Sequence, residues 1–208
     1  MTANATGVFG LGSTFNGPTA TIDTTNYAGI GLEGREAQFD DVTPATSAGA
    51  TTRRSDRVKK CLLVRNVSGI ALLPKRLVTY QAAYYGKRVD GYCDIDFEFA
   101  AGVVDEYLPA AGVRNGDLFW LTTQGPTLAK TSNGADATNV HTEGTPVFAL
   151  TAANSTATTN SGRVQPFTLT SNLTNAGTWV MNTIGRAMSS KTTANSNVDI
   201  LVDLTLMP

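Results

Sequence analysis

The sequence predicts an all-β fold, a small antiparallel β-barrel or sandwich with a long extended N-terminal arm. Three observations predict it. Uncharged polar residues are abundant, with 31 Thr, 14 Asn, 11 Ser and 20 Gly among 208 residues; threonine favours strands, and the other three favour turns. Short apolar runs recur at intervals of roughly ten residues, as in sandwiches and barrels. Apolar residues show no sustained helical spacing, so no helix is predicted.

Residues 1–57 are predicted to form the extended arm. They are rich in Gly, Thr, Ala and Pro and lack sustained apolar alternation. Isolated apolar side chains, such as Phe9 and Phe15, are too numerous for a plain linker. We therefore expect the arm to lie along a neighbouring surface and to become ordered on binding. Residues 58–208 are predicted to form a β-rich core domain.

The elements of the core are predicted from apolar runs bounded by turn residues. Residues 66–69 are a predicted turn, and the Asn-Gly pair at 115–116 predicts a two-residue hairpin. The last two strands are expected to pair with each other, because residues 198–206 alternate between apolar and mostly polar side chains. The predicted strands are, in chain order, 61–64, 77–80, 92–99, 118–121, 146–150, 164–169, 179–188 and 198–206.

The predicted strand 92–99 raises the main functional question. Asp94, Asp96 and Glu98 alternate with apolar residues, so on a strand the three carboxylates share one face. Such a face suits an acid–base pair, a hard-metal site or a wet surface towards a cationic partner. Glycosidases usually take their two carboxyl groups from different elements, and calcium needs about six to eight oxygens, often from a loop. We therefore expect a solvated or salt-bridged face and no catalytic residue, metal or cofactor.

The cysteines and the single histidine offer little chemistry. Cys61 and Cys93 lie in no C-x-x-C motif and near no histidine, so both are expected to be small buried apolar residues. His141 lies in a polar, turn-rich stretch without a nucleophile motif and is expected at the surface. A zinc site or a histidine-dependent triad is therefore not expected, and we expect the protein not to be an enzyme.

Charge is unevenly distributed along the chain. The net charge is −1, yet residues 53–88 contain ten basic residues and one acidic residue, a local charge of +9. Residues 1–52 carry −4 and residues 89–208 carry −6. This segregation predicts complementary contacts, including contacts between copies of the chain. The candidate interface residues are Arg53, Arg54, Arg57, Lys59 and Lys60 on the basic side and Asp94, Asp96 and Glu98 on the acidic side.

Two classes of partner are disfavoured. The isoelectric point of about 5.8 and the lack of a known nucleic-acid motif argue against direct nucleic-acid binding. No apolar run reaches the roughly 18 residues of a membrane-spanning helix, and the N-terminus lacks the pattern of a signal peptide. We therefore expect a protein made in a cytoplasm and no membrane partner.

Three stretches resemble small structural proteins of tailed bacteriophages. RNVSGIALLPKRLVTY at 65–80 resembles their N-x-S/T-G-x-x-L opening, and AGVVDEYLPAAGVRNGDLFWLTTQGPTLAK at 101–130 resembles the spacer and strand that follow. IGRAMSSKTTANSNVDILVDLTL at 184–206 is similar to their closing hairpin. The resemblance extends in pattern over residues 62–206 and does not include residues 1–57.

The resemblance implies a capsid decoration, or cement, protein. Such a protein has a compact β-domain, usually forms a homotrimer, and docks on the major capsid protein of the assembled head to brace it against packaged DNA. It would be made in the bacterial host cytoplasm and would end on the capsid surface of the virion. The resemblance carries no catalytic residue, and it implies that Gly69, Gly116 and Gly185 serve as turn residues of the fold.

Two alternatives remain open at this stage. The first is another β-rich virion component, such as a tail-tube or head-fibre protein. The second is a carbohydrate-binding module, which would use the acidic strand together with an exposed Trp120 or Trp179. Both tryptophans lie in apolar contexts, DLFWL and TWVM, so we expect both to be buried.

Overall fold

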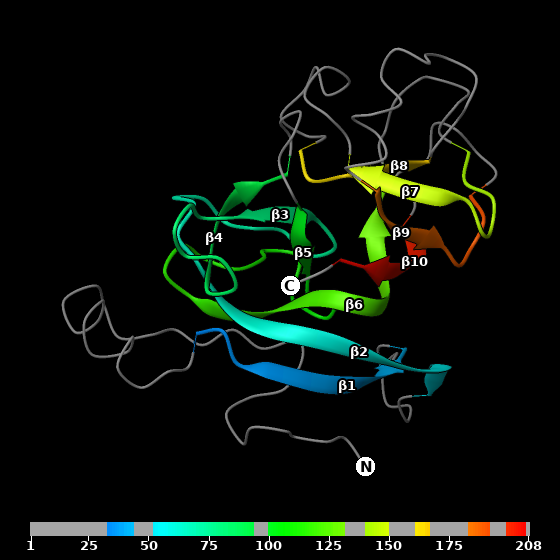
Figure 1. Cartoon of the computed structure of the whole chain (residues 1–208), viewed down its shortest axis with the longest axis horizontal. Coiled ribbons are helices and arrows are strands. Elements are labelled where there is room, and N and C mark those ends of the chain that lie inside the picture. The colour runs from blue at the N-terminus through cyan, green and yellow to red at the C-terminus, as the bar shows by residue number, and fades with distance from the viewer. Residues whose placement is uncertain are drawn as a thin grey trace.

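The computed structural model describes residues 33–43, 52–93, 100–131, 140–149, 161–166, 183–191 and 199–206. These residues form strands joined by turns and include no helix, so the predicted all-β class is confirmed (Figure 1). The strands are β1 (Glu36–Val42), β2 (Arg53–Asn66), β3 (Leu77–Tyr80), β4 (Arg88–Tyr92), β5 (Ala100–Val104), β6 (Leu118–Lys130), β7 (Pro146–Ala149), β8 (Val164–Pro166), β9 (Thr183–Ala187) and β10 (Asp199–Thr205).

Five of the strands close into a ring. The order β2-β4-β3-β5-β6 is completed by a second pairing of β6 with β2, which runs from Lys60 opposite Gln124 to Arg65 opposite Leu118. The named strand pairs in the described part of the chain are antiparallel except for the short β2–β4 ladder. Closure leaves no free edge within the ring. The ring encloses an apolar core made of Leu62, Val64, Leu72, Val78, Val89, Ala101, Val104, Leu108, Val113, Phe119 and Leu121.

The long strand β6 joins this barrel to a second layer. Its first half pairs with β2 and β5, and its second half pairs with β10, beyond which β9, β7 and β8 follow in order. Figure 1 shows β7 to β10 gathered on one side of the barrel. Gly125, which has a φ of +87°, lies where the pairing of β6 passes from β2 to β10. A second apolar core fills the space around the second half of β6, with Ala129, Val147, Val164, Ile184, Ile200 and Val202 among its members.

Strand β1 lies along the outer side of β2 (Figure 1). The pairing passes from Asp40 opposite Val58 to Val42 opposite Arg53, so residues 54–57 of β2 stand opposite Asp41 alone. This is a large β-bulge, a feature that redirects side chains. A third apolar cluster, which includes an edge-to-face contact of Phe39 with Trp120 at 5.3 Å, packs β1 against β2 and β6.

Several predicted elements are confirmed. The strand 77–80 coincides with β3, and β9 and β10 pair as the predicted closing hairpin, with Ala187 opposite Val202. The turn at 66–69 forms as well: the Asn66 side-chain oxygen accepts a hydrogen bond from the Ser68 amide at 3.0 Å, and Gly69 has a φ of +77°. The predicted strands 146–150 and 164–169 begin where β7 and β8 begin.

Other elements differ from the prediction. The strand predicted at 61–64 is only the middle of β2, and the one predicted at 118–121 is only the start of β6. Strand β5 was not predicted, because Ala-Ala-Gly-Val-Val has no alternating pattern. The Asn-Gly pair at 115–116 does form a turn, with a φ of +92° at Gly116. However, this turn joins the isolated bridge at Val113 to β6 and does not connect two paired strands.

The predicted arm is described only in part. Residues 36–42 form β1, and residues 53–57 are the beginning of β2, which runs continuously through the predicted boundary between residues 57 and 58. This part of the predicted arm therefore belongs to the sheet, because its charged residues form ion pairs across β1 and β2. Residues 1–32 and 44–51 lie outside the described residues, and there the arm stays a prediction.

The burial of Cys61, Cys93 and Trp120 is confirmed, and burial raises the pKa of the Cys61 thiol to about 12. Trp179 lies outside the described residues. The surface position predicted for His141 is wrong, because its side chain is 0% exposed. The reason is a two-residue bridge with Lys191, in which the two backbones exchange hydrogen bonds of 3.0 and 2.8 Å. Among the described residues, neither ring nitrogen of His141 finds a hydrogen-bond partner.

His141 should make the stability of the protein depend on pH. Burial, and secondarily the charge of Lys191, lower the pKa of His141 from 6.5 to about 4. Between these values the unfolded chain binds a proton that the folded chain does not, so stability is full above pH 6.5 and falls as the pH decreases towards 4. In urea titrations from pH 4 to 7.5, His141→Leu should flatten this slope by up to about 1.4 kcal/mol per pH unit. Parallel slopes for the two proteins would contradict this.

Gly125 should tolerate no side chain. It has a positive φ, and a Cβ atom at this position would overlap the carbonyl oxygen of Val58. Gly116 is the matched control, because its φ is also positive but a Cβ atom would meet nothing within 4 Å. By urea denaturation we expect Gly116→Ala to lose about 1 kcal/mol from backbone strain alone and Gly125→Ala to lose about 3 kcal/mol or more. Equal losses would show that the close approach of β6 to β2 is unimportant.

Candidate functional site

The structure divides the predicted interface residues into two groups. The five basic candidates lie on the first half of β2, where the bulge opposite Asp41 turns some side chains inwards and others outwards. Arg54 and Lys59 turn inwards, whereas Arg53, Arg57 and Lys60 are exposed. The acidic candidates Asp94, Asp96 and Glu98 lie outside the described residues, so their contact with the basic side stays a prediction.

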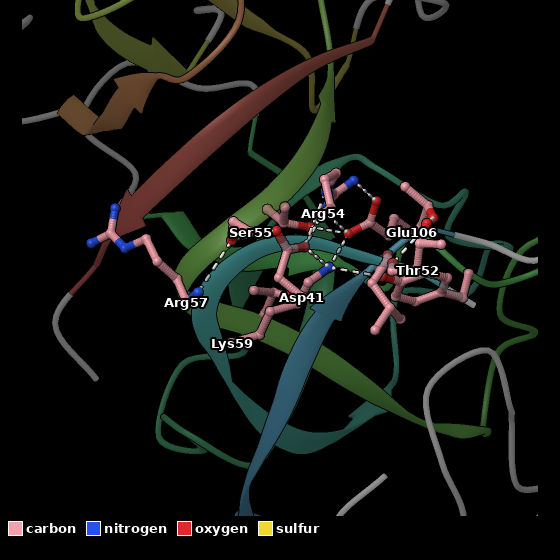
Figure 2. Close-up of polar contacts among 12 residues, drawn as sticks. Asp41, Thr52, Arg54, Ser55, Arg57, Lys59 and Glu106 are labelled. Atoms are coloured by element: carbon pink, nitrogen blue, oxygen red, sulfur yellow. Dashed lines mark hydrogen bonds and ion pairs between the residues drawn. The ribbon is translucent and has the colours of Figure 1, made fainter. Parts of the chain in front are cut away.

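The inward side chains form an ion cluster, which we define as Asp41, Arg54, Lys59 and Glu106 (Figure 2). The Arg54 guanidinium donates to Asp41 at 2.5 and 3.0 Å and to both oxygens of Glu106 at 2.9 Å. The Lys59 ammonium also donates to Glu106 and lies 3.7 Å from Asp41. Arg54 is the most exposed member, at 14% of its side chain. Two cations thus face two carboxylates in a nearly dry site.

Neutral polar groups complete the ion cluster. The Ser55 hydroxyl donates to Asp41 at 2.8 Å, and the Thr127 hydroxyl donates to Glu106 at 3.4 Å. The ring of Tyr107 lies 4.8 Å from the Lys59 ammonium, and its hydroxyl donates to the carbonyl oxygen of Val42. Buried charges are tolerated when they are paired and their remaining hydrogen-bonding groups are satisfied, and this site meets both conditions.

The protonation of the ion cluster follows from this environment. Burial alone would lower the pKa of Arg54, but its hydrogen bonds to Glu106 and Asp41 and their charges outweigh burial and raise that pKa above its ordinary value. Burial, assisted by the charge of Glu106, raises the pKa of the Tyr107 hydroxyl. Arg54 therefore stays charged and Tyr107 stays neutral, so neither group is poised to exchange a proton near neutral pH.

Sequence reasoning missed both acidic members of the ion cluster. Asp41 lies on β1, two residues after Phe39. Glu106 lies in the turn after β5, where the Asp105 side chain accepts a hydrogen bond from the Tyr107 amide at 3.0 Å. The available signal was a pair of acidic residues interrupting an apolar run, as in VVDEYL. The candidate interface residue Lys59 lies in the interior of the folded chain, with 1% of its side chain exposed, and its charge is paired with Glu106.

Two of the exposed basic residues of β2, Arg53 and Arg57, also have ion-pair partners within the chain. Arg53 pairs with Asp40 of β1 at 2.8 Å. Arg57 reaches across to β10 and pairs with Asp203 at 2.5 Å; Figure 2 shows this side chain pointing away from the ion cluster. Both arginines have about half of their side-chain surface exposed, so both remain accessible to a partner.

Three further residues of the basic segment are paired with carboxylates in a similar way. Arg65 and Arg88 share the carboxylate of Glu33, at 2.5 and 3.2 Å, and Lys75 pairs with Asp199 at 2.6 Å. The acidic partners come from the two acidic portions of the sequence, 1–52 and 89–208. The segregation of charge along the sequence is therefore to a large extent complementarity within one folded chain.

A groove opens beside the exposed part of β2, where β6 leaves β2 at Gly125. It has a volume of about 580 Å³ and is open to solvent. Within the described ranges, residues 53–57 of β2 lie opposite β1 and have no pairing with β4 or β6, whereas the backbone of Val58 and Lys59 is approached by Gly125 of β6. The Val58 side chain, which is 44% exposed, gives the groove an apolar surface. The residues lining the groove are Asp56, Arg57, Val58, Lys60, Gln124, Gly125, Asp203, Leu204 and Thr205.

The chemistry of these two features differs. Both carboxylates of the ion cluster are already bound by cations, so they lack the separate environments that distinguish an acid from a base. Among the described residues, no group of three His, Cys, Asp or Glu side chains could hold a metal ion, and no helix could span a membrane. The groove, with its strand edge, apolar side chain and charges of both signs, suits an extended polypeptide.

Comparisons with known proteins identify no relative: no family model, curated protein or solved structure matches the chain. A function must therefore be argued from the residues and their geometry.

Breaking the ion cluster should strongly destabilise the fold. Glu106→Gln would leave Lys59 and Arg54 buried with the single carboxylate of Asp41, and removing one partner of a buried pair costs about 3–5 kcal/mol. Glu143→Gln is the matched control, since Glu143 is exposed, and it should change stability by less than about 0.5 kcal/mol. Urea denaturation at pH 7 measures both. A loss below about 1 kcal/mol for Glu106→Gln would show that the ion cluster is not structurally important.

Proposed function

We propose that this chain is a structural virion protein that decorates the assembled capsid of a tailed bacteriophage and stabilises it. The sequence resemblance over residues 62–206 supports this proposal. The elements that carry the resemblance are well defined in the fold: the turn at 66–69 is closed by a hydrogen bond from the Ser68 amide to the Asn66 side chain, and β9 pairs with β10. In this proposal the protein is made in the host cytoplasm and ends on the outer surface of the capsid.

The observation that carries the proposal is the groove between β2, β6 and β10. An extended segment from a neighbouring subunit can add to the strand edge of residues 53–57, with main-chain hydrogen bonds for affinity and the exposed Val58 side chain for an apolar contact. The pair of Arg57 with Asp203 at the same place can re-pair with charges of either sign on the incoming segment. A protein that links subunits of a shell needs such a contact.

The ion cluster supports the same function in a different way. A protein that stabilises a capsid must not unfold locally under load. Local unfolding is easiest in regions that have few buried contacts. Here the ion cluster fixes β1 and β2 to the turn that follows β5, and the closed barrel leaves no free edge within the ring. Such cross-linking of the strands suits a protein that must carry load at the groove.

Light scattering during size-exclusion chromatography tests the oligomeric state. The expected mass is three times the chain mass of 21.9 kDa. Purified protein should also co-sediment, in a saturable manner, with empty capsids of the phage whose genome encodes it, and should raise their melting temperature. A stable monomer that does not bind capsids would refute the proposal. Rings or tubes would instead support a tail-tube protein.

The groove can be tested with a matched pair of variants. Val58→Asp places a charge in the groove, and Val140→Asp places one at a valine of similar exposure, 39% against 44%, outside the groove. We expect Val58→Asp to weaken trimer formation or capsid binding by about tenfold or more and Val140→Asp to leave both unchanged. Both variants should keep the circular dichroism spectrum of the wild type. Equal binding by the two variants would exclude the groove as a contact.

A further inference from the structure

The turn between β3 and β4 exposes aromatic side chains that the fold does not need. Tyr85 is 73% exposed, and Tyr84 is 42% exposed. The two alanines before them, Ala82 and Ala83, are exposed as well. Exposed apolar residues that cluster in this way are typical of contact sites, whereas isolated ones need no explanation.

The backbone of this turn is held in a fixed conformation. The Gln81 amide donates to the Arg88 carbonyl oxygen at 2.9 Å, and the Tyr84 amide donates to the Gln81 carbonyl oxygen at 3.0 Å. Ala83 has a φ of +66°, which is unusual for a residue other than glycine. Such strain persists only where the surrounding structure enforces it, and it is frequent at functional positions.

The two aromatic rings are also held in place. The Arg88 guanidinium lies 4.2 Å from the centre of the Tyr84 ring, and Arg88 is itself anchored by Glu33 at 3.2 Å. The Tyr85 ring packs its edge against Tyr80, with 6.1 Å between ring centres. Rings that are already oriented lose little entropy on binding, and tyrosines of this kind often dominate the affinity of protein interfaces.

We propose that Tyr84 and Tyr85 form a docking knob that inserts into a hollow, acidic-rimmed site on the capsid shell. This inference rests on the proposed decoration function and names the partner surface. The rim should be acidic because the Lys87 side chain is exposed beside the rings and, within the described part of the chain, forms no ion pair, whereas Arg88 is already paired with Glu33. The groove serves contacts between subunits, so the docking knob supplies a second, separate contact.

The positions of the two features agree with separate roles. The Lys87 carbonyl oxygen accepts a hydrogen bond from the Arg65 amide, near the end of β2, whereas the groove lies around Val58. Seven residues of strand separate Val58 from Arg65, which corresponds to about 23 Å along β2. A partner of ordinary size can therefore cover one feature and leave the other free.

Two other classes of partner fit the turn less well. Single-stranded nucleic acid stacks on aromatic rings but also needs a row of cations for its phosphates, and in this turn Arg88 is already held by Glu33, next to the exposed Asp90. Carbohydrate recognition requires polar side chains beside the stacking ring to bind hydroxyl groups, whereas the residues before the rings are alanines.

The test uses the full-length chain with Tyr84→Ser and Tyr85→Ser combined. The hydrogen bonds that shape the turn come from the backbone, so the variant should keep its circular dichroism spectrum and its urea midpoint should move little. We expect its affinity for empty capsids in co-sedimentation to fall by about tenfold to a hundredfold, with the mass in light scattering unchanged. Tyr85→Phe, which keeps the ring, should bind like the wild type. Ile70→Ser, at another exposed apolar residue, is the control and should also bind normally.

The outcomes separate the two proposals. If the wild type binds capsids and the double serine variant binds equally well, the docking knob is refuted and the decoration function stands. If the wild type binds no capsids, the decoration function fails and the docking knob fails with it. Loss of the trimer in the double variant would assign the rings to a contact between copies, and tyrosine-dependent binding of oligo-dT or of a glycan would assign them to another ligand. Each of these results would overturn the inference.

Discussion

The pairing of Glu106 with Arg54 and Lys59 is the interaction on which the arrangement of β1 and β2 depends. Two cations inside a folded chain require compensating charge, because an unpaired buried charge costs several kcal/mol. Asp41 comes from β1, and Glu106 comes from the turn after β5. The bulge in β2 follows from this requirement, since it brings residues 54–57 around Asp41. Neither strand can shift in register without separating these charges.

The same principle explains the distribution of charge over the molecule. The basic segment 53–88 predicts a strongly positive patch only if its charges stay on the surface. In the fold, Glu33, Asp40, Asp41, Glu106, Asp199 and Asp203 each pair with at least one of these basic residues. In the proposed association, shape and apolar contact at Val58 and Tyr85 would supply most of the affinity, and charge would act on orientation and rate.

The sequence predicts the parts of the fold whose cause is local. Apolar runs bounded by turn residues identify β3 and β7, alternation of apolar and mostly polar residues identifies β10 of the closing hairpin, and Asn66, whose side chain accepts a hydrogen bond from the Ser68 amide, marks the turn at 66–69. The first half of β2 cannot be predicted from its local sequence, because its charged residues are typical of a loop. What makes it a strand is ion pairing with Glu106, which is 52 residues from Arg54 and 47 from Lys59. His141 is buried for a similar reason, through its bridge to Lys191.

Strand β2 unites the structural and functional features of the chain. It pairs with β1, β4 and β6, carries two members of the ion cluster, and forms one wall of the groove. Its far end is hydrogen-bonded to the turn that presents Tyr84 and Tyr85. If the groove and the docking knob are contact sites as proposed, a force applied at either would be resisted by three strand pairings at once, and separating those strands would also expose the buried charges. Strand β2 would then couple the two proposed contacts mechanically, as the proposed bracing of a shell requires.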